Sequence, residues 1–166
     1  EVESRVYAWA RSVGKEPADR EFEVIPTIDV DSAFAYKNRS FYRAAGATIR
    51  DAFRGDWLRI QERIKVLRGL GADPFDTYDW LEGVHQRYGL RARYFFLLAD
   101  RSEYDRGVSW KSGGMKALIG QIQKTADLGI HPGYASHESA HTHQLEVEIA
   151  RLKSLSGEEV LHARQH

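Results

Sequence analysis

The chain has 166 residues, of which 42% are hydrophobic and 29% charged, the composition of one ordinary globular domain. Its 24 basic residues balance its 24 acidic ones, so no net charge would draw it to nucleic acid or an anionic membrane, and no nucleic-acid partner is expected. It has no cysteine and no apolar run near the about 20 residues of a transmembrane helix, which excludes disulfides, thiolate metal sites and a membrane span.

The first part of the chain predicts a strand followed by helical sequence. Residues 22–31 (FEVIPTIDVD) are rich in Val and Ile and end in acids, which is typical of a buried strand. A loop and weakly helical sequence follow over 32–55. Residues 56–69 predict a helix that ends at a glycine. Its predicted apolar face is Leu58, Ile64 and Leu67.

The middle of the chain predicts a turn, a helix and a second strand. Turn residues Asp73 and Pro74 precede a helix that begins at Asp76 or Thr77 and ends before a glycine at position 89. Residues 91–100 (RARYFFLLAD) are aromatic and aliphatic, which predicts a buried strand.

The last part alternates helix and strand again. A helix is expected over 115–126, a short strand over 128–132, a helix within 136–157 and a fourth strand over 158–166. The apolar face of the last helix is Leu145, Ile149 and Leu152. Strands that alternate with helices and are apolar on both faces predict an α/β fold with a parallel sheet or barrel. The chain begins at Glu1 and stops within a strand-like run, so we expect a piece of a longer polypeptide.

Polar side chains stand at the carboxyl ends of the predicted strands. The first strand ends with Asp29 and Asp31, the third with His131, and the fourth with Arg164 and His166. Sites are built at this end of parallel sheets and barrels, and two carboxylates with two imidazoles suit a nitrogen–oxygen metal site. Each acid by itself could equally be a loop cap or an ion-pair partner. His131 by itself could be a strand-end histidine whose hydrogen bonds are satisfied.

A second histidine pattern lies in HESAH, residues 137–141, which matches the H-E-x-x-H pattern of zinc peptidases. If Ser136 caps the helix, His137 and His141 could share one face, whereas a cap at Ser139 leaves His137 outside the helix. No third ligand follows at the spacing of that pattern. The alternative is that these histidines lie on a solvated helix start.

The segments PTIDVDSAFAY, RARYFFLLAD, DLGIHPGYASH and EEVLHARQH, in this order, resemble the polysaccharide deacetylase family, carbohydrate esterase family 4. The resemblance runs from about residue 22 to the end, and DPFDTYDW fits a further loop motif of a bacterial branch. It implies a distorted (β/α) barrel, incomplete in this chain, with one divalent metal ion, commonly zinc. It also implies hydrolysis of acetyl groups from N-acetylated sugars by a metal-activated water, with a carbohydrate as the partner.

The resemblance assigns roles to individual residues. Asp29 matches the catalytic base, Arg164 the arginine that orients this base, and Asp31 and His131 two metal ligands. The family's second histidine falls at Ala135 here, so the third ligand is expected to be His166 or, alternatively, His137.

The resemblance to the family, together with the changed histidine position, leads to several further expectations. Tyr134, beside the first histidine, is the candidate for stacking against a sugar ring. The family's general acid would lie beyond this chain, so the rest of the parent polypeptide is expected to complete the domain. Because a ligand position has changed, the alternative function is a non-catalytic, carbohydrate-binding or structural relative, and a zinc peptidase using HESAH is a third possibility.

Overall fold

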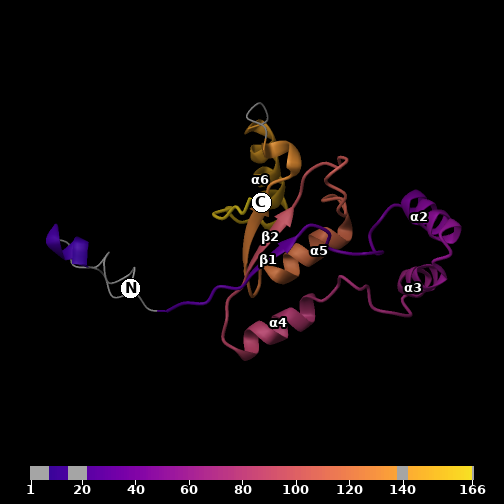
Figure 1. Cartoon of the computed structure of the whole chain (residues 1–166), viewed down its shortest axis with the longest axis horizontal. Coiled ribbons are helices and arrows are strands. Elements are labelled where there is room, and N and C mark those ends of the chain that lie inside the picture. The colour runs from indigo at the N-terminus through magenta and orange to yellow at the C-terminus, as the bar shows by residue number, and fades with distance from the viewer. Residues whose placement is uncertain (1–7, 15–21, 138–141, 166) are drawn as a thin grey trace.

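A three-stranded parallel sheet forms the centre of the computed structural model, which describes residues 8–14, 22–137 and 142–165 (Figure 1). The strands are β1 (Thr27–Val30), β2 (Arg93–Leu97) and β3 (Asp127–His131), in the order β1-β2-β3. Asp29 pairs with Phe95, and Phe95 with Gly129. All three strands run in the same direction, so their carboxyl ends lie along one edge. The described residues form a mixed α/β fold with an open sheet, not a closed barrel.

The first two strands are shorter than the sequence predicts, and β3 has the predicted length but begins and ends one residue earlier. β1 begins only after Pro26, which has no N–H to donate, although its carbonyl accepts a hydrogen bond from Arg93 N at 2.8 Å. The predicted fourth strand is reduced to one parallel bridge between Ile130 and Ala163. Two backbone hydrogen bonds hold this bridge, from Ile130 N to His162 O (2.9 Å) and from Arg164 N to Ile130 O (3.0 Å). The end of the described chain therefore lies beside β3, where a fourth parallel strand would pair.

Five helices and a 3₁₀ turn connect and cover the strands over the described residues 22–165. They are α2 (Phe41–Phe53), α3 (Trp57–Leu67), α4 (Tyr78–Arg87), α5 (Gly113–Ile122), η1 (Tyr134–His137) and α6 (Thr142–Ser156). Local signals set several ends: Ser112 accepts a hydrogen bond from Met115 N at the start of α5, and Gly69 (φ +71°) follows α3 in the left-handed conformation. α5 ends before the predicted residue 126, because the chain must reach β3 at Asp127, whose N–H bonds to Ala92 O.

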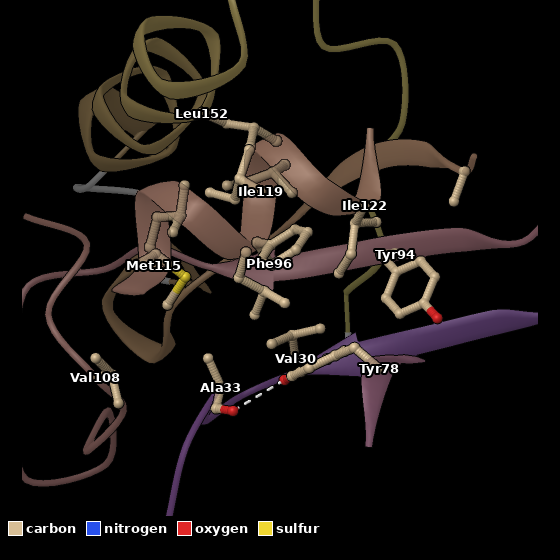
Figure 2. Packing of buried hydrophobic residues seen from close by; sticks show 14 of the residues in the cluster. Val30, Ala33, Tyr78, Tyr94, Phe96, Val108, Met115, Ile119, Ile122 and Leu152 are labelled. Atoms are coloured by element: carbon tan, nitrogen blue, oxygen red, sulfur yellow. Dashed lines mark hydrogen bonds between the residues drawn. The ribbon is translucent and has the colours of Figure 1, made fainter. Parts of the chain in front are cut away.

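The hydrophobic core lies on one face of the sheet, between the strands and helices α4, α5 and α6 (Figure 2). Even-numbered strand residues fill it, including Val30, Tyr94, Phe96 and Ile130, and Leu152 packs on them from α6. Tyr78 joins this core and donates a hydrogen bond from its hydroxyl to Ala33 O at 3.2 Å, drawn in Figure 2. The predicted apolar face of the last helix is confirmed, since Leu145 and Ile149 also pack against the cluster.

The predicted apolar face of α3 is wrong. The helix buries Ile60, Arg63 and Val66 instead, and Leu58 is 81% exposed. Arg63 is buried because its guanidinium forms an ion pair of 2.5 Å with Asp51 of α2. α2 and α3 therefore pair through a buried charge contact that periodicity does not reveal, and in Figure 1 the pair stands to one side of the sheet.

Candidate functional site

Two of the predicted metal ligands meet at the carboxyl edge of the sheet. His131 is the last residue of β3, and Asp31 is the first residue beyond β1. The His131 Nε2 atom lies 3.3 Å from Asp31 Oδ1. The imidazole is almost completely buried, whereas 63% of the Asp31 side chain is exposed. The fold thus presents a buried ring nitrogen and a solvent-facing carboxylate to the same small space.

A backbone contact fixes the orientation of the His131 ring. Its Nδ1 lies 2.8 Å from the carbonyl oxygen of Arg164. A carbonyl oxygen can only accept, so Nδ1 carries a hydrogen, and Nε2 is the ring nitrogen that faces Asp31. Metal-binding histidines are typically held by such a hydrogen bond from the second ring nitrogen.

The predicted base and its arginine also meet. Arg164 Nη1 lies 3.6 Å from Asp29 Oδ1 and donates a hydrogen bond to Thr27 Oγ1 at 2.6 Å. The backbone bond from Arg164 to Ile130 sets its position beside β3. Asp29 lies within β1, and Asp31 is the first residue beyond it, at the same carboxyl end of the strand. One residue, Arg164, thereby orients both the candidate base through its side chain and the candidate ligand through its carbonyl.

The proposed third ligands fall outside the part of the chain that the structure describes. This holds for all of His166 and for the side chain of His137, whose backbone ends η1. Residues 138–141 of HESAH lie outside it as well, so the peptidase pairing stays a prediction. Among the described residues, no group of three or more His, Cys, Asp or Glu side chains could hold a metal ion. Asp31 and His131 suit zinc in chemical type, but a catalytic zinc site needs one protein ligand more.

The predicted sugar-stacking residue has an aromatic partner that the sequence did not reveal. The rings of Tyr134 and Tyr104 stack with centroids 4.0 Å apart and planes 26° apart. Both rings are more than half exposed. They line a cavity of about 410 Å³ together with Asp31 and His131. An exposed aromatic pair therefore stands beside the candidate metal ligands.

Two buried carboxylates hold the loop that carries Tyr134. Asp105 accepts a hydrogen bond from Tyr134 N at 3.2 Å, and Glu148 of α6 accepts one from Gly133 N at 3.0 Å. Glu148 also accepts from the Ser136 hydroxyl at 3.1 Å. Sequence reasoning missed both acids. Only Glu148 could have been noticed in the sequence, because it is a charged residue on the apolar face of α6, beside Leu152.

A third buried carboxylate, Asp73, holds the loop after β1 and the residue Phe75 beside the cavity. It accepts hydrogen bonds from the backbone N–H groups of Ala35, Tyr36, Lys37 and Phe75 at 2.8 to 3.1 Å. Burial raises the pKa of Asp73, but these four hydrogen bonds together outweigh it and leave the pKa below its usual value. Asp73 thus ties the loop after β1 to Phe75, which lines the cavity.

Close backbone approach excludes side chains at two points beside the cavity. A Cβ atom on Gly107 would lie 2.5 Å from Asp31 O, and one on Gly133 would lie 2.4 Å from the Ala99 side chain. Both glycines are thus required by the packing of loops around the candidate ligands.

Comparisons of the chain with models of protein families, with curated proteins and with solved structures found no match in any of the three. No helix among the described residues has the length and apolar character needed to cross a membrane.

Proposed function

We propose that this chain carries the metal-binding part of a carbohydrate N-deacetylase of the polysaccharide deacetylase type. The observation that carries the proposal is the 3.3 Å contact between Asp31 and His131, which come from the ends of two strands separated by β2. The two motifs that predicted these ligands are about 100 residues apart in the chain, and their meeting is what the deacetylase motifs require.

The alternation of side chains along the strands supports the barrel expected for this family. Even-numbered strand residues join the helix-covered core, and Asp29, Phe95 and His131 lie at odd positions outside it. In a (β/α) barrel, one set of strand side chains faces the helices and the other faces the interior. The described sheet has this pattern, and the proposed barrel would be completed by further strands.

The Asp31 carboxylate and the His131 ring would hold the metal ion, with His166 as the third ligand. A bound zinc ion polarises an acetamide carbonyl and lowers the pKa of water toward about 7. Asp29 would accept the proton of the attacking water, with Arg164 holding its carboxylate in place. The Tyr104–Tyr134 surface would support the sugar ring.

That same stacked pair favours a second candidate, a carbohydrate-binding relative without catalytic activity. An exposed aromatic surface binds sugar rings without a metal, and the family's second histidine position is Ala135 here. This candidate predicts sugar binding that is unchanged by metal removal.

Zinc binding by metal-stripped protein, measured by calorimetry, tests the proposal. We expect one zinc ion per chain, with binding lost in Asp31→Ala, His131→Ala and His166→Ala. The matched control is His143→Ala, which removes an exposed histidine of α6. Zinc binding that survives loss of Asp31 and His131 contradicts the proposal.

Further variants separate the alternatives. Loss of zinc binding in His137→Ala and His141→Ala, with Asp31→Ala unaffected, would support the peptidase instead. If His137→Ala abolishes binding and His166→Ala does not, the loop histidine is the third ligand. A parent chain that binds no zinc but binds N-acetylglucosamine would favour the non-catalytic candidate.

A further inference from the structure

A second, larger cavity of about 750 Å³ lies between α2, α3 and the loop that follows β2. Seven of the residues that line it are arginines, and one, Glu62, is an acid. The chain as a whole has no net charge, so this concentration of positive charge is local. The arginines come from α2, α3 and the two loops that follow β1 and β2.

Three of the seven arginines have carboxylate partners. Arg50 and Arg63 face Asp51 at 3.6 and 2.5 Å, and Arg59 faces Asp56 at 3.6 Å. Glu62 accepts a hydrogen bond from the Tyr36 hydroxyl at 2.6 Å.

The other four arginines are Arg39, Arg43, Arg101 and Arg106. Among the described residues, no carboxylate lies within ion-pair distance of them. The cavity therefore holds more positive charge than its walls neutralise.

Arg39 shows most clearly that the positive charge in this cavity is not fully compensated. Its Nη2 donates to Ser32 Oγ (3.0 Å) and Phe34 O (3.1 Å), but its buried Nε has no partner among the described residues. Burial lowers the pKa of Arg39, and Asp73 offsets this effect in part, while Arg101 lowers the pKa further. Burial, Arg101 and Arg39 likewise lower the pKa of Arg43. An anion in the cavity would relieve this mutual repulsion.

The arginine-lined cavity and the cavity at the strand ends share a wall. Arg39, Phe75 and Arg106 line both. The two cavities are therefore adjacent, and a ligand that occupies both must pass these three side chains.

We propose that the arginine-lined cavity binds a phosphate or carboxylate group of an anionic saccharide whose acetamido group reaches Asp31 and His131. The saccharide part rests on the proposed function, whereas the anion site stands on the arginines alone. Guanidinium groups bind both oxyanions through paired, charge-assisted hydrogen bonds. Four unneutralised arginines, contributed by three segments of the chain, match a ligand with several anionic oxygens.

Binding of small anionic sugars tests the proposal. The probes are N-acetylglucosamine 6-phosphate and N-acetylmuramic acid, with neutral N-acetylglucosamine and inorganic phosphate for comparison, titrated by calorimetry at low and high salt. We expect the anionic sugars to bind more tightly than either comparison ligand, and their affinity to fall as salt is raised.

The decisive variant is Arg43→Gln with Arg101→Gln, which removes two charges that make no ion pair among the described residues. The matched control, Arg54→Gln with Arg68→Gln, removes two exposed charges at the C-terminal ends of α2 and α3, outside the cavity. We expect the first pair to weaken binding of the anionic sugars about tenfold or more, which corresponds to about 1.4 kcal/mol. The control pair should change it less than about twofold.

Equal weakening by the two pairs, or equal affinity for anionic and neutral sugars, would overturn the proposal. Inorganic phosphate that binds as tightly as the sugar phosphate would refute the saccharide part, and so would tighter binding of a single-stranded oligonucleotide. Asp31→Ala in metal-stripped protein separates this proposal from the deacetylase. Anion binding that survives Asp31→Ala but not the cavity variant supports the arginine site even if the chain proves to bind no zinc.

Discussion

Replacement of Asp73 by alanine should destabilise the fold and distort both cavities. The Asp73 carboxylate is buried and accepts four backbone hydrogen bonds from the loop after β1 and from Phe75. A buried N–H group left without an acceptor costs about 1–3 kcal/mol, and part of that cost is recovered when the loop moves and water enters. For the four groups together we expect a loss of about 3–5 kcal/mol in the free energy of unfolding.

Asp76, three residues further along the chain than Asp73, provides the control. Asp76 pairs with Lys37 at 3.0 Å, and both side chains are partly exposed, so Asp76→Ala should cost less than about 1 kcal/mol. Urea unfolding of the parent and both variants measures the two values. If the Asp73 and Asp76 variants differ by less than about 0.5 kcal/mol, the hydrogen bonds of Asp73 do not hold the loop.

The same carboxylate predicts how stability depends on pH. The pKa of Asp73 in the folded chain lies below its unfolded value of about 3.9. The folded state therefore binds its proton more weakly, and the contribution of Asp73 to stability is complete well above pH 4. It is lost as the pH falls through the lower, folded-state pKa. Relative to the parent, Asp73→Asn should show a smaller loss of stability on acidification over this range, and an unchanged pH dependence would contradict the assigned direction.

Two further predictions concern the core and the α2–α3 pair. Phe96 is fully buried between the sheet and α5, and its replacement by alanine should lower the free energy of unfolding by about 3–5 kcal/mol. Replacement of the exposed Phe53 should lower it by less than about 0.5 kcal/mol. Denaturant unfolding of both variants measures the two values, and equal losses would mean that the core is elsewhere. Burial and the hydrogen bond to Glu62 raise the pKa of Tyr36 to about 12. In a spectrophotometric titration its phenol should therefore ionise at a higher pH than the exposed tyrosines, and Glu62→Gln should lower the pKa of Tyr36. A Tyr36 that titrates with the exposed tyrosines would show that this contact does not form.

The α2–α3 pair has consequences for the candidate site as well as for the fold. The arginine-lined cavity that it borders includes Arg39, Arg43 and residues of the loop after β2. This cavity shares Phe75 with the cavity at the strand ends. The pair is held partly by the buried contact between Asp51 and Arg63, and this hydrogen bond is the largest cause that keeps the pKa of Asp51 low. Loss of one partner from such a pair leaves a buried charge uncompensated, so the arginine cavity depends on both residues being present.

The sequence by itself determined the parallel strands and what stands at their ends. Runs of Val, Ile and aromatic residues identify strands through local side-chain preference, and the order of helix and strand requires them to be parallel. Parallel strands place their carboxyl ends along one edge, so Asp31 and His131 could be expected to meet before any coordinates were known. The pairing of Arg164 with Asp29 was implied by the resemblance to the deacetylase motifs and not by this rule.

Only the tertiary structure decided which faces are buried and which loops meet. The apolar spacing of α3 predicted Leu58 at its buried face, but the Asp51–Arg63 contact turned another face inward. Asp73 and Glu148 are ordinary acids in the sequence, and their roles depend on backbone N–H groups up to 38 residues away. The cavity arginines likewise gather from separate segments. Periodicity records the local geometry of one element, whereas hydrogen bonds and charge contacts between distant segments depend on how the whole chain packs.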